Sequence, residues 1–283
     1  MESHLDIFTE NGYLVVPGAL DTEDLGPLTH VICDVVDKRT HEMYRAGTIA
    51  HVYEDTPFDK RWYAVLQDCG KENEVFGWHT LVYSEALFNL ITNRKVLDII
   101  ETLIGDEIQF NGDFWVRPKL PNEKLTTLPW HQDSAYMPHT EHDTHLTVWL
   151  PLVDVKTENG ALQFLPRSHK EGLKSYHRIE GEAFAVPVIS PTSSDINIDT
   201  LEMNKGDLLI FNNLVFHRSL LNKSGTIRWS VDFRYSRTGT SLEGLWHEVI
   251  ACPVREKDNK QCPTSWKEWQ RQWNASPHKD RFI

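Results

Sequence analysis

The sequence contains few cysteines: four in 283 residues, with no CxxC pair among them. Their wide separation argues against a disulfide framework and against a cysteine-based zinc cluster. The pattern is typical of reduced, mostly structural thiols, and it predicts a cytoplasmic protein. The four positions are Cys33, Cys69, Cys252 and Cys262.

Long apolar runs and basic residues are also scarce. No run of about 18 apolar residues is present, so no transmembrane helix is predicted, and the N-terminus lacks the basic and apolar regions of a signal peptide. The 29 basic residues are outnumbered by 41 acidic ones, which gives a formal net charge of −12. This charge argues against nucleic acids and anionic membranes as partners. A small molecule is the expected partner, and the sequence leaves a homodimer open.

The chain is long enough for one large domain with a substantial core, since 40% of its residues are hydrophobic. We predict a single domain over 1–283, in which 1–107 is mainly helical support, 108–240 a jelly-roll core and 241–283 a tryptophan-rich extension. Apolar residues recur at helical spacing from about Thr22 to Arg39, and again between Ser84 and Gly105. A brief strand is predicted at 13–16.

After Ile108 the hydrophobic pattern changes to a period of two, which is typical of strands. For example, Leu146, Val148 and Leu150 alternate with Thr147 and Trp149. Each strand then has one apolar face, which the N-terminal helices can cover, and one face with polar groups that would line a site. Short strands joined by turns predict a mainly β fold with flanking helices. We expect a double-stranded β-helix, a cupin-like jelly roll, with the N-terminal helices on the outer face of one sheet.

His131-Gln132-Asp133 is the most informative motif. On a strand, the side chains of His131 and Asp133 would point to the same side. A second imidazole from another strand would complete the two-His-one-carboxylate set that binds non-haem Fe(II) and leaves three coordination positions open. The same spacing occurs at His4-Leu5-Asp6 near the terminus, so the spacing alone proves little.

Three residues downstream add to this motif. His217 follows a turn and a predicted buried strand, and Ser219 shares its face. After the turn at Asn222, the next strand carries Arg228. A hairpin of this length can bring the guanidinium back beside the metal.

The order and spacing of these pieces resemble the phytanoyl-CoA dioxygenase family of Fe(II)/2-oxoglutarate oxygenases. The resemblance extends from Phe8 to Trp229 and so covers most of the chain. Its motifs are Phe8-Thr9-Glu10-Asn11-Gly12-Tyr13, His131-Gln132-Asp133, Trp149, Asn159-Gly160-Ala161-Leu162, Pro166-Arg167-Ser168-His169-Lys170, Lys205-Gly206-Asp207, His217-Arg218-Ser219, Asn222 and Arg228-Trp229.

The resemblance implies the roles of the site residues. The catalytic iron ligands would be His131, Asp133 and His217. The cosubstrate-binding residues would be Arg228 and Ser219 at the distal carboxylate of 2-oxoglutarate, with Trp149 and Gln132 nearby. An arginine suits this task because burial of an unpaired carboxylate is prohibitive and a guanidinium offers a planar, bidentate fork. Fe(II), 2-oxoglutarate and O2 are therefore expected, with ascorbate as a reductant in vitro.

The expected reaction is oxidation, most simply hydroxylation, of a C–H bond in a small, partly apolar molecule such as a natural-product intermediate, with release of succinate and CO2. The carboxylate of Asp133 favours oxygenation, because halogenating relatives have Gly or Ala at this position. Desaturation, cyclisation and epoxidation by the same iron chemistry stay open. So do a catalytically inactive jelly-roll binding protein and a zinc hydrolase with the same ligands.

Five residues on the presumed cavity side or near the iron are candidate substrate contacts. They are Arg117, Tyr136, Met137, Trp115 and Arg234. For the two arginines there is a plainer alternative, in which they only form salt bridges with Asp113 or Asp232.

Overall fold

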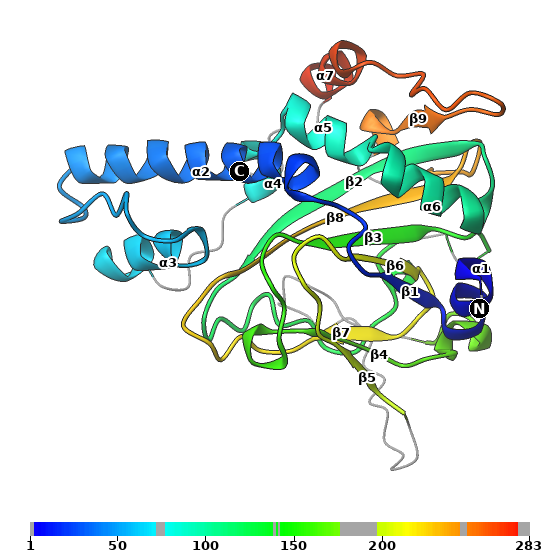
Figure 1. Cartoon of the computed structure of the whole chain (residues 1–283), viewed down its shortest axis with the longest axis horizontal. Coiled ribbons are helices and arrows are strands. Elements are labelled where there is room, and N and C mark those ends of the chain that lie inside the picture. Colours follow the sequence, from blue (N-terminus) through cyan, green and yellow to red (C-terminus); the bar gives the residue numbers. More distant parts are fainter. Residues whose placement is uncertain are drawn as a thin grey trace.

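The computed structural model describes residues 3–71, 77–137, 140, 142–175, 197–243 and 248–276. Two antiparallel sheets form its centre, and helices cover one face of the larger sheet (Figure 1). The six-stranded sheet has the order β1-β6-β3-β8-β2-β9, and the three-stranded sheet has the order β5-β4-β7. This is the predicted mainly β jelly roll with N-terminal helices on the outer face of one sheet.

The larger sheet consists of β1 (Tyr13–Val16), β6 (Leu208–Asn212), β3 (Leu146–Pro151), β8 (Arg228–Arg237), β2 (Ile108–Lys119) and β9 (Cys252–Arg255). The smaller sheet consists of β5 (Asp199–Leu201), β4 (Leu162–Phe164) and β7 (His217–Ser219). The helices are α1 (His4–Asn11), α2 (Thr22–Arg45), α3 (Phe58–Asp68), α4 (Trp78–Leu81), α5 (Glu85–Ile91), α6 (Arg94–Ile104) and α7 (Trp266–Ala275). Short 3-10 turns lie at Asp133–Ala135, Thr157–Asn159, Ser168–Glu171 and Glu248–Ile250.

The two predicted helical stretches differ from the structure in their bounds. α2 begins at a capping box formed by Asp21 and Asp24, and it continues to Arg45, beyond the predicted end near Arg39. The single apolar stripe from Ser84 to Gly105 is divided into α5 and α6. The division falls where the side chain of Asn93 accepts a hydrogen bond from a backbone N–H of the next helix and so caps α6.

The alternation along the central strands separates core from cavity. On β3, Leu146, Val148 and Leu150 are buried with the helices in one hydrophobic cluster, whereas Thr147 and Trp149 line a cavity on the other face. β8 repeats this division over its length. The polar faces of the strands therefore point inward, because the helices cover the apolar faces.

Both edges of the larger sheet come from outside 108–240. β1 pairs with β6 at one edge, and β9 pairs with β2 at the other. In the C-terminal part, Trp269 of α7 is fully buried and donates a hydrogen bond from Nε1 to the Ile250 carbonyl. The ring of Tyr83 stacks on Trp273 with centroids 4.3 Å apart, so the described part of the extension packs on the helical layer.

All four cysteines are free thiols. Within the described ranges, no helix combines the length and the apolar character that a membrane crossing requires.

Candidate metal centre

The predicted iron ligands converge at the junction of the two sheets. His131 and His217 pair through two backbone hydrogen bonds of 3.0 Å, one in each direction, so their side chains leave the backbone side by side. Asp133 begins the 3-10 turn that follows. The carboxylate therefore reaches the histidines from a turn and not from a regular strand, which differs from the strand geometry that the His-x-Asp spacing predicts.

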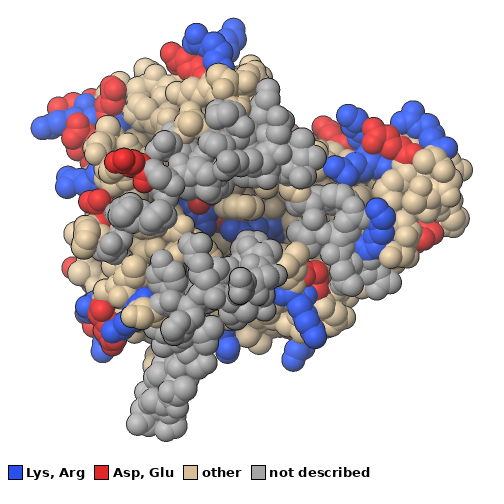
Figure 2. Space-filling view, turned by 180° about the vertical axis from the view of Figure 1, so that it is seen from behind, with Lys and Arg blue, Asp and Glu red and all other residues tan. Residues whose placement is uncertain are grey.

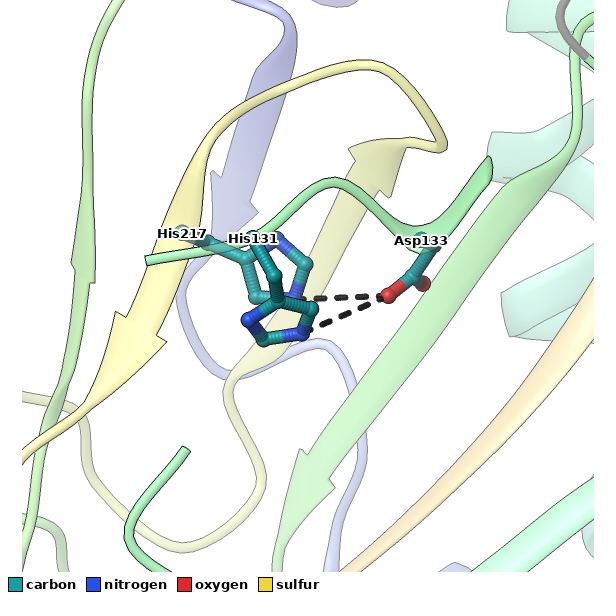
Figure 3. Close-up of side chains that lie close together, drawn as sticks. All are labelled: His131, Asp133 and His217. Carbon is teal, nitrogen blue, oxygen red and sulfur yellow. Dashed lines mark ion pairs between the residues drawn. The ribbon is translucent and has the colours of Figure 1, made fainter. Parts of the chain in front are cut away.

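The three side chains can share one ion. Asp133 Oδ1 lies 3.7 Å from His131 Nε2 and 3.5 Å from His217 Nε2 (Figure 3). One potential ligand atom from each residue lies within 4.8 Å of the others, and all three residues are buried. Among the described residues, one group of three His, Cys, Asp or Glu side chains has metal-binding geometry, and it consists of these three residues.

Hydrogen bonds fix the two imidazoles for metal binding. His131 Nδ1 lies 2.8 Å from the Pro129 carbonyl oxygen, and His217 Nδ1 lies 3.1 Å from that of Val215. A carbonyl only accepts, so each Nδ1 carries the proton and each Nε2 keeps a lone pair for a metal. Burial lowers the pKa of both histidines, that of His131 to about 3. Both rings are therefore neutral, as metal ligands must be.

The carboxylate is held ionised and in place. Burial alone would raise the pKa of Asp133, but neighbouring groups, including Arg234, outweigh this effect and lower it. Thr147 donates a 2.7 Å hydrogen bond to Oδ2, which leaves Oδ1 facing the histidines. Two neutral imidazoles and one carboxylate on one side of an ion are the donors that non-haem Fe(II) takes in oxygen-using enzymes, so the residues fit this metal.

A cavity of about 340 Å³ opens beside the three ligands. Inward-facing residues of β2, β3 and β8 form much of its wall. Seen from behind, this face of the molecule has a central hollow with Lys or Arg side chains at its bottom (Figure 2). The predicted residues Trp115, Arg117, Tyr136, Met137, Trp149, Ser219, Arg228 and Arg234 all line the cavity.

Arg228 is buried in this cavity and makes no ion pair with a carboxylate of the described residues. Its Nη1 donates to Ser230 Oγ at 2.8 Å, and its Nε has no hydrogen-bond partner in the part of the chain that the structure describes. The guanidinium carbon lies 5.2 Å from the centre of the Trp149 ring. Burial, with Arg117 nearby, lowers the pKa of Arg228. A buried guanidinium with an unused donor is expected to take an anion, because an orphaned charged donor is costly.

Lys119 is a cavity residue that the sequence analysis missed. It lies opposite Arg228 in the β2–β8 register and is fully buried. Its Nζ donates to the Thr126 carbonyl at 2.8 Å and to Ser219 Oγ at 3.1 Å. Burial, followed by the charge of Arg228, lowers the pKa of Lys119 to about 6. The missed signal was the period of two, which continues from Arg117 to Lys119 across Pro118.

Two of the sequence motifs support Lys119. Gly160 has a φ of +97°, and a Cβ there would lie 2.6 Å from the Lys119 Cδ and 2.9 Å from a backbone oxygen. Only glycine leaves room for the lysine stem at this position. Asn222 Nδ2 donates a 2.8 Å hydrogen bond to the Lys119 carbonyl and so holds the end of β2.

Gln132 does not reach the cavity. Its amide nitrogen donates to the backbone oxygens of Gly172 at 3.0 Å and Leu214 at 2.6 Å, and its oxygen accepts from the Lys174 N–H at 2.9 Å. The structure therefore places Gln132 outside the predicted cosubstrate pocket. The reason is alternation, since its side chain points away from those of its two neighbours.

Comparisons with known proteins agree with this geometry. Residues 8–230 match the family model described as Phytanoyl-CoA dioxygenase (PhyH). The chain is 27% identical over 181 residues to the "Probable alpha-ketoglutarate-dependent hypophosphite dioxygenase" of Stutzerimonas stutzeri, covering 60% of this chain and 58% of that protein, which is less than two thirds of its length. It is 24% identical over 265 residues to the peroxisomal phytanoyl-CoA dioxygenase of Homo sapiens, covering 86% of this chain and 72% of that protein.

Among solved structures, the chain is similar to the epimerase SnoN in complex with Fe3+, alpha ketoglutarate and nogalamycin RO. The TM-score is 0.55 at 20% sequence identity, and the match covers 90% of this chain and 86% of that one. At this identity the likeness shows a shared fold.

Proposed function

Because the chain belongs to the phytanoyl-CoA dioxygenase family of non-haem iron and 2-oxoglutarate-dependent oxygenases, we propose that it oxidises a C–H bond of a small organic molecule. The overall reaction consumes 2-oxoglutarate and O2 and releases succinate and CO2 with the oxidised product. Hydroxylation is the simplest outcome. The observation that carries the proposal is the convergence of three metal ligands and a buried arginine with an unused donor on one cavity.

His131, Asp133 and His217 would hold the iron. When bound, iron supplies the activation of O2 and the oxidising power that amino-acid side chains lack. The protein keeps both Nε2 lone pairs available through the Nδ1 hydrogen bonds described above. Through Thr147 it also keeps Asp133 Oδ1 turned toward the metal position.

Arg228, Lys119 and Ser219 would hold the distal carboxylate of 2-oxoglutarate. The unused Nε of Arg228 can donate to one carboxylate oxygen, and Lys119, which already contacts Ser219, can supply a second positive charge. Trp149 would cover the carbon chain and exclude water. These residues orient the cosubstrate, so its keto-acid end faces the metal ligands.

The substrate is proposed to be small and partly apolar. The cosubstrate must share the 340 Å³ cavity, which limits the remaining space. Trp115 and Met137 supply apolar surface on its wall. Desaturation, cyclisation and epoxidation need the same residues, so product analysis must separate them from hydroxylation.

The direct test measures succinate. Purified protein with Fe(II), ascorbate and 2-oxoglutarate is expected to form succinate, and to form more in the presence of a substrate from a metabolite library. His131→Ala and His217→Ala should each lose Fe(II) binding and turnover, because the two ligands that remain in each variant hold the ion only weakly. His30→Ala, at an exposed position on α2, is the matched control and should behave as wild type. Normal turnover in either ligand variant, or substrate conversion without O2 and 2-oxoglutarate, would refute the proposal.

A further inference from the structure

We infer that the substrate carries a carboxylate and that Arg117 binds it. This inference rests on the proposed function, since it assigns the part of the cavity that iron and 2-oxoglutarate leave for the substrate. Three features of the cavity support it. Arg117 and Arg234 have unequal environments, and the hydroxyl of Tyr136 has no hydrogen-bond partner among the described residues. The cavity wall also has more basic than acidic residues.

Arg117 and Arg234 face the same cavity but have different surroundings. Arg234 is enclosed by carboxylates, because its Nε lies 3.1 Å from Asp113 and its Nη1 lies 2.6 Å from Asp232. Its Nη2 faces the metal ligand Asp133 at 3.8 Å. Every nitrogen of this guanidinium therefore faces a carboxylate of the protein. These three carboxylates compensate the charge of Arg234, so we assign it to positioning the site.

Arg117 has one carboxylate partner and a free edge. Its Nε donates to Asp232 at 2.6 Å and its Nη2 more weakly at 3.4 Å, while its Nη1 makes no hydrogen bond within the described residues. The side chain is 27% exposed, whereas that of Arg234 is 10% exposed. Asp232 thus fixes the direction of the Arg117 guanidinium without using all of its donors. A guanidinium held from one side is preorganised to bind a planar anion on the other.

Tyr136 offers a second donor. Its hydroxyl is buried, lines the cavity and has no hydrogen-bond partner in the described part of the chain. A phenol is protonated at neutral pH, so the group is an O–H donor. A buried hydroxyl without a partner is costly, and an acceptor on the substrate would satisfy it.

The charge of the cavity favours an anion. Its lining includes five basic residues, namely Arg117, Lys119, Arg218, Arg228 and Arg234, and three acidic ones, namely Asp113, Asp133 and Asp232. Iron(II) and the 2-oxoglutarate dianion carry equal and opposite charges, so their binding leaves this excess unchanged. The excess persists even when Lys119 is neutral. This local balance is the reverse of that of the whole chain, whose net charge is −12.

The body of the substrate would lie on Trp115. The indole Nε1 donates to Asp113 at 2.8 Å, which fixes the ring, and the Arg117 guanidinium carbon lies 5.0 Å from the ring centre. The charged group and the flat apolar wall are therefore adjacent. This arrangement fits a monocarboxylate with an apolar or aromatic body, and a planar carboxylate matches the single free edge of Arg117.

The test compares acids with their amides. Ni(II)-loaded protein saturated with 2-oxoglutarate is titrated with 3-phenylpropionate, cinnamate and indole-3-acetate, and with the corresponding primary amides, by isothermal titration calorimetry. The acids are expected to bind about 10- to 100-fold more tightly than the amides, as a charged hydrogen bond would provide. Arg117→Gln should abolish this preference and leave the affinity for 2-oxoglutarate within about twofold, on the same scale. Arg117→Lys, which keeps a partner for Asp232, should retain part of the preference, and Arg94→Gln, at an exposed position at the start of α6, should retain all of it.

Each outcome decides the inference. Amides that bind wild type as tightly as the acids, failure of all three acids to bind, or a preference that survives Arg117→Gln would overturn it. A variant that loses 2-oxoglutarate binding instead would make Arg117 a cosubstrate ligand, so the substrate assignment would fail while the oxygenase proposal stands. Wild-type protein that binds no 2-oxoglutarate would contradict the proposed function itself.

Discussion

Binding of 2-oxoglutarate is expected to take up a proton at Lys119. In the free protein, burial and then the charge of Arg228 lower the pKa of this amine to about 6. At pH 7, one unit higher, only about 10% of it is charged. A dianion bound beside the amine would raise its pKa again, because an opposite charge favours the protonated form.

The sign of the pH dependence follows from this shift. The pKa is higher in the complex than in the free protein, so the contribution of the lysine charge to binding is complete below pH 6 and is lost as the pH rises through the pKa of the complex. Between these two values, the dissociation constant of 2-oxoglutarate should increase by about tenfold per pH unit, as uptake of one proton requires.

The size of the effect can be estimated for Lys119→Met. A charge-assisted hydrogen bond contributes about 1.5–3 kcal/mol, and protonation of the amine at pH 7 costs about 1.4 kcal/mol of this. The variant should therefore bind 2-oxoglutarate up to about tenfold more weakly at pH 7 and more weakly still relative to wild type near pH 6. Methionine fills the space of the lysine stem beside Gly160, so the fold should be preserved.

Calorimetry provides the assay. 2-Oxoglutarate is titrated into protein with excess Ni(II), which keeps the histidine ligands deprotonated, at several pH values and in buffers of different ionisation enthalpy. Wild type and the exposed control Lys223→Met should show proton uptake and the pH slope, whereas Lys119→Met should show neither. An unchanged slope in Lys119→Met, or no uptake in wild type, would refute the reasoning.

Three further predictions concern the support of the site. Gly160→Ala combines an unfavourable left-handed backbone with a clash against Lys119, so thermal unfolding should show a loss of about 1–3 kcal/mol and titration a weaker affinity for 2-oxoglutarate. Thr147→Val removes the hydrogen bond to Asp133 and should weaken Fe(II) binding by about tenfold in an anaerobic titration, with little change in stability; equal affinity would mean that the bond has no orienting role. Arg234→Gln leaves the buried carboxylate of Asp113 without its guanidinium partner, whereas Asp232 keeps Arg117. It should cost about 3–5 kcal/mol in denaturant unfolding, so a stable variant would contradict its structural role.

Much of the fold was predictable because one physical signal dominates it. On β3 and β8 the helices bury every second residue, so the alternation identified Thr147 and Arg234 as inward-facing. The helical stripe after Ser84 was less informative, because periodicity does not show where a side chain such as Asn93 caps a new helix. The contribution of β9 to the sheet depends on long-range pairing with β2, which no local pattern encodes.

The site was predictable to a similar extent and for a similar reason. His131, Asp133 and His217 could be found because their spacing and order are specific. Lys119 was not among the predicted site residues, although the alternation that placed Arg117 inward continues to it across Pro118. Gln132 shows the opposite error. Its position beside two ligands suggested a pocket role, but alternation turns its side chain toward the backbone of 172–174.

β2 connects the two ends of the cavity. Trp115, Arg117 and Lys119 occupy alternate positions on its inward face, so each is about 7 Å from the next along the strand. The strand thus presents an apolar wall, a candidate substrate anchor and a cosubstrate amine in a fixed order. Because a shift of one residue would turn all three outward, the register of β2 with β8 determines both anion sites at once. The register of β2 with β8 shifts between Phe110 and Phe114, just before these residues. From Phe114 to Lys119 the pairing is continuous, and in this register the three side chains point into the cavity.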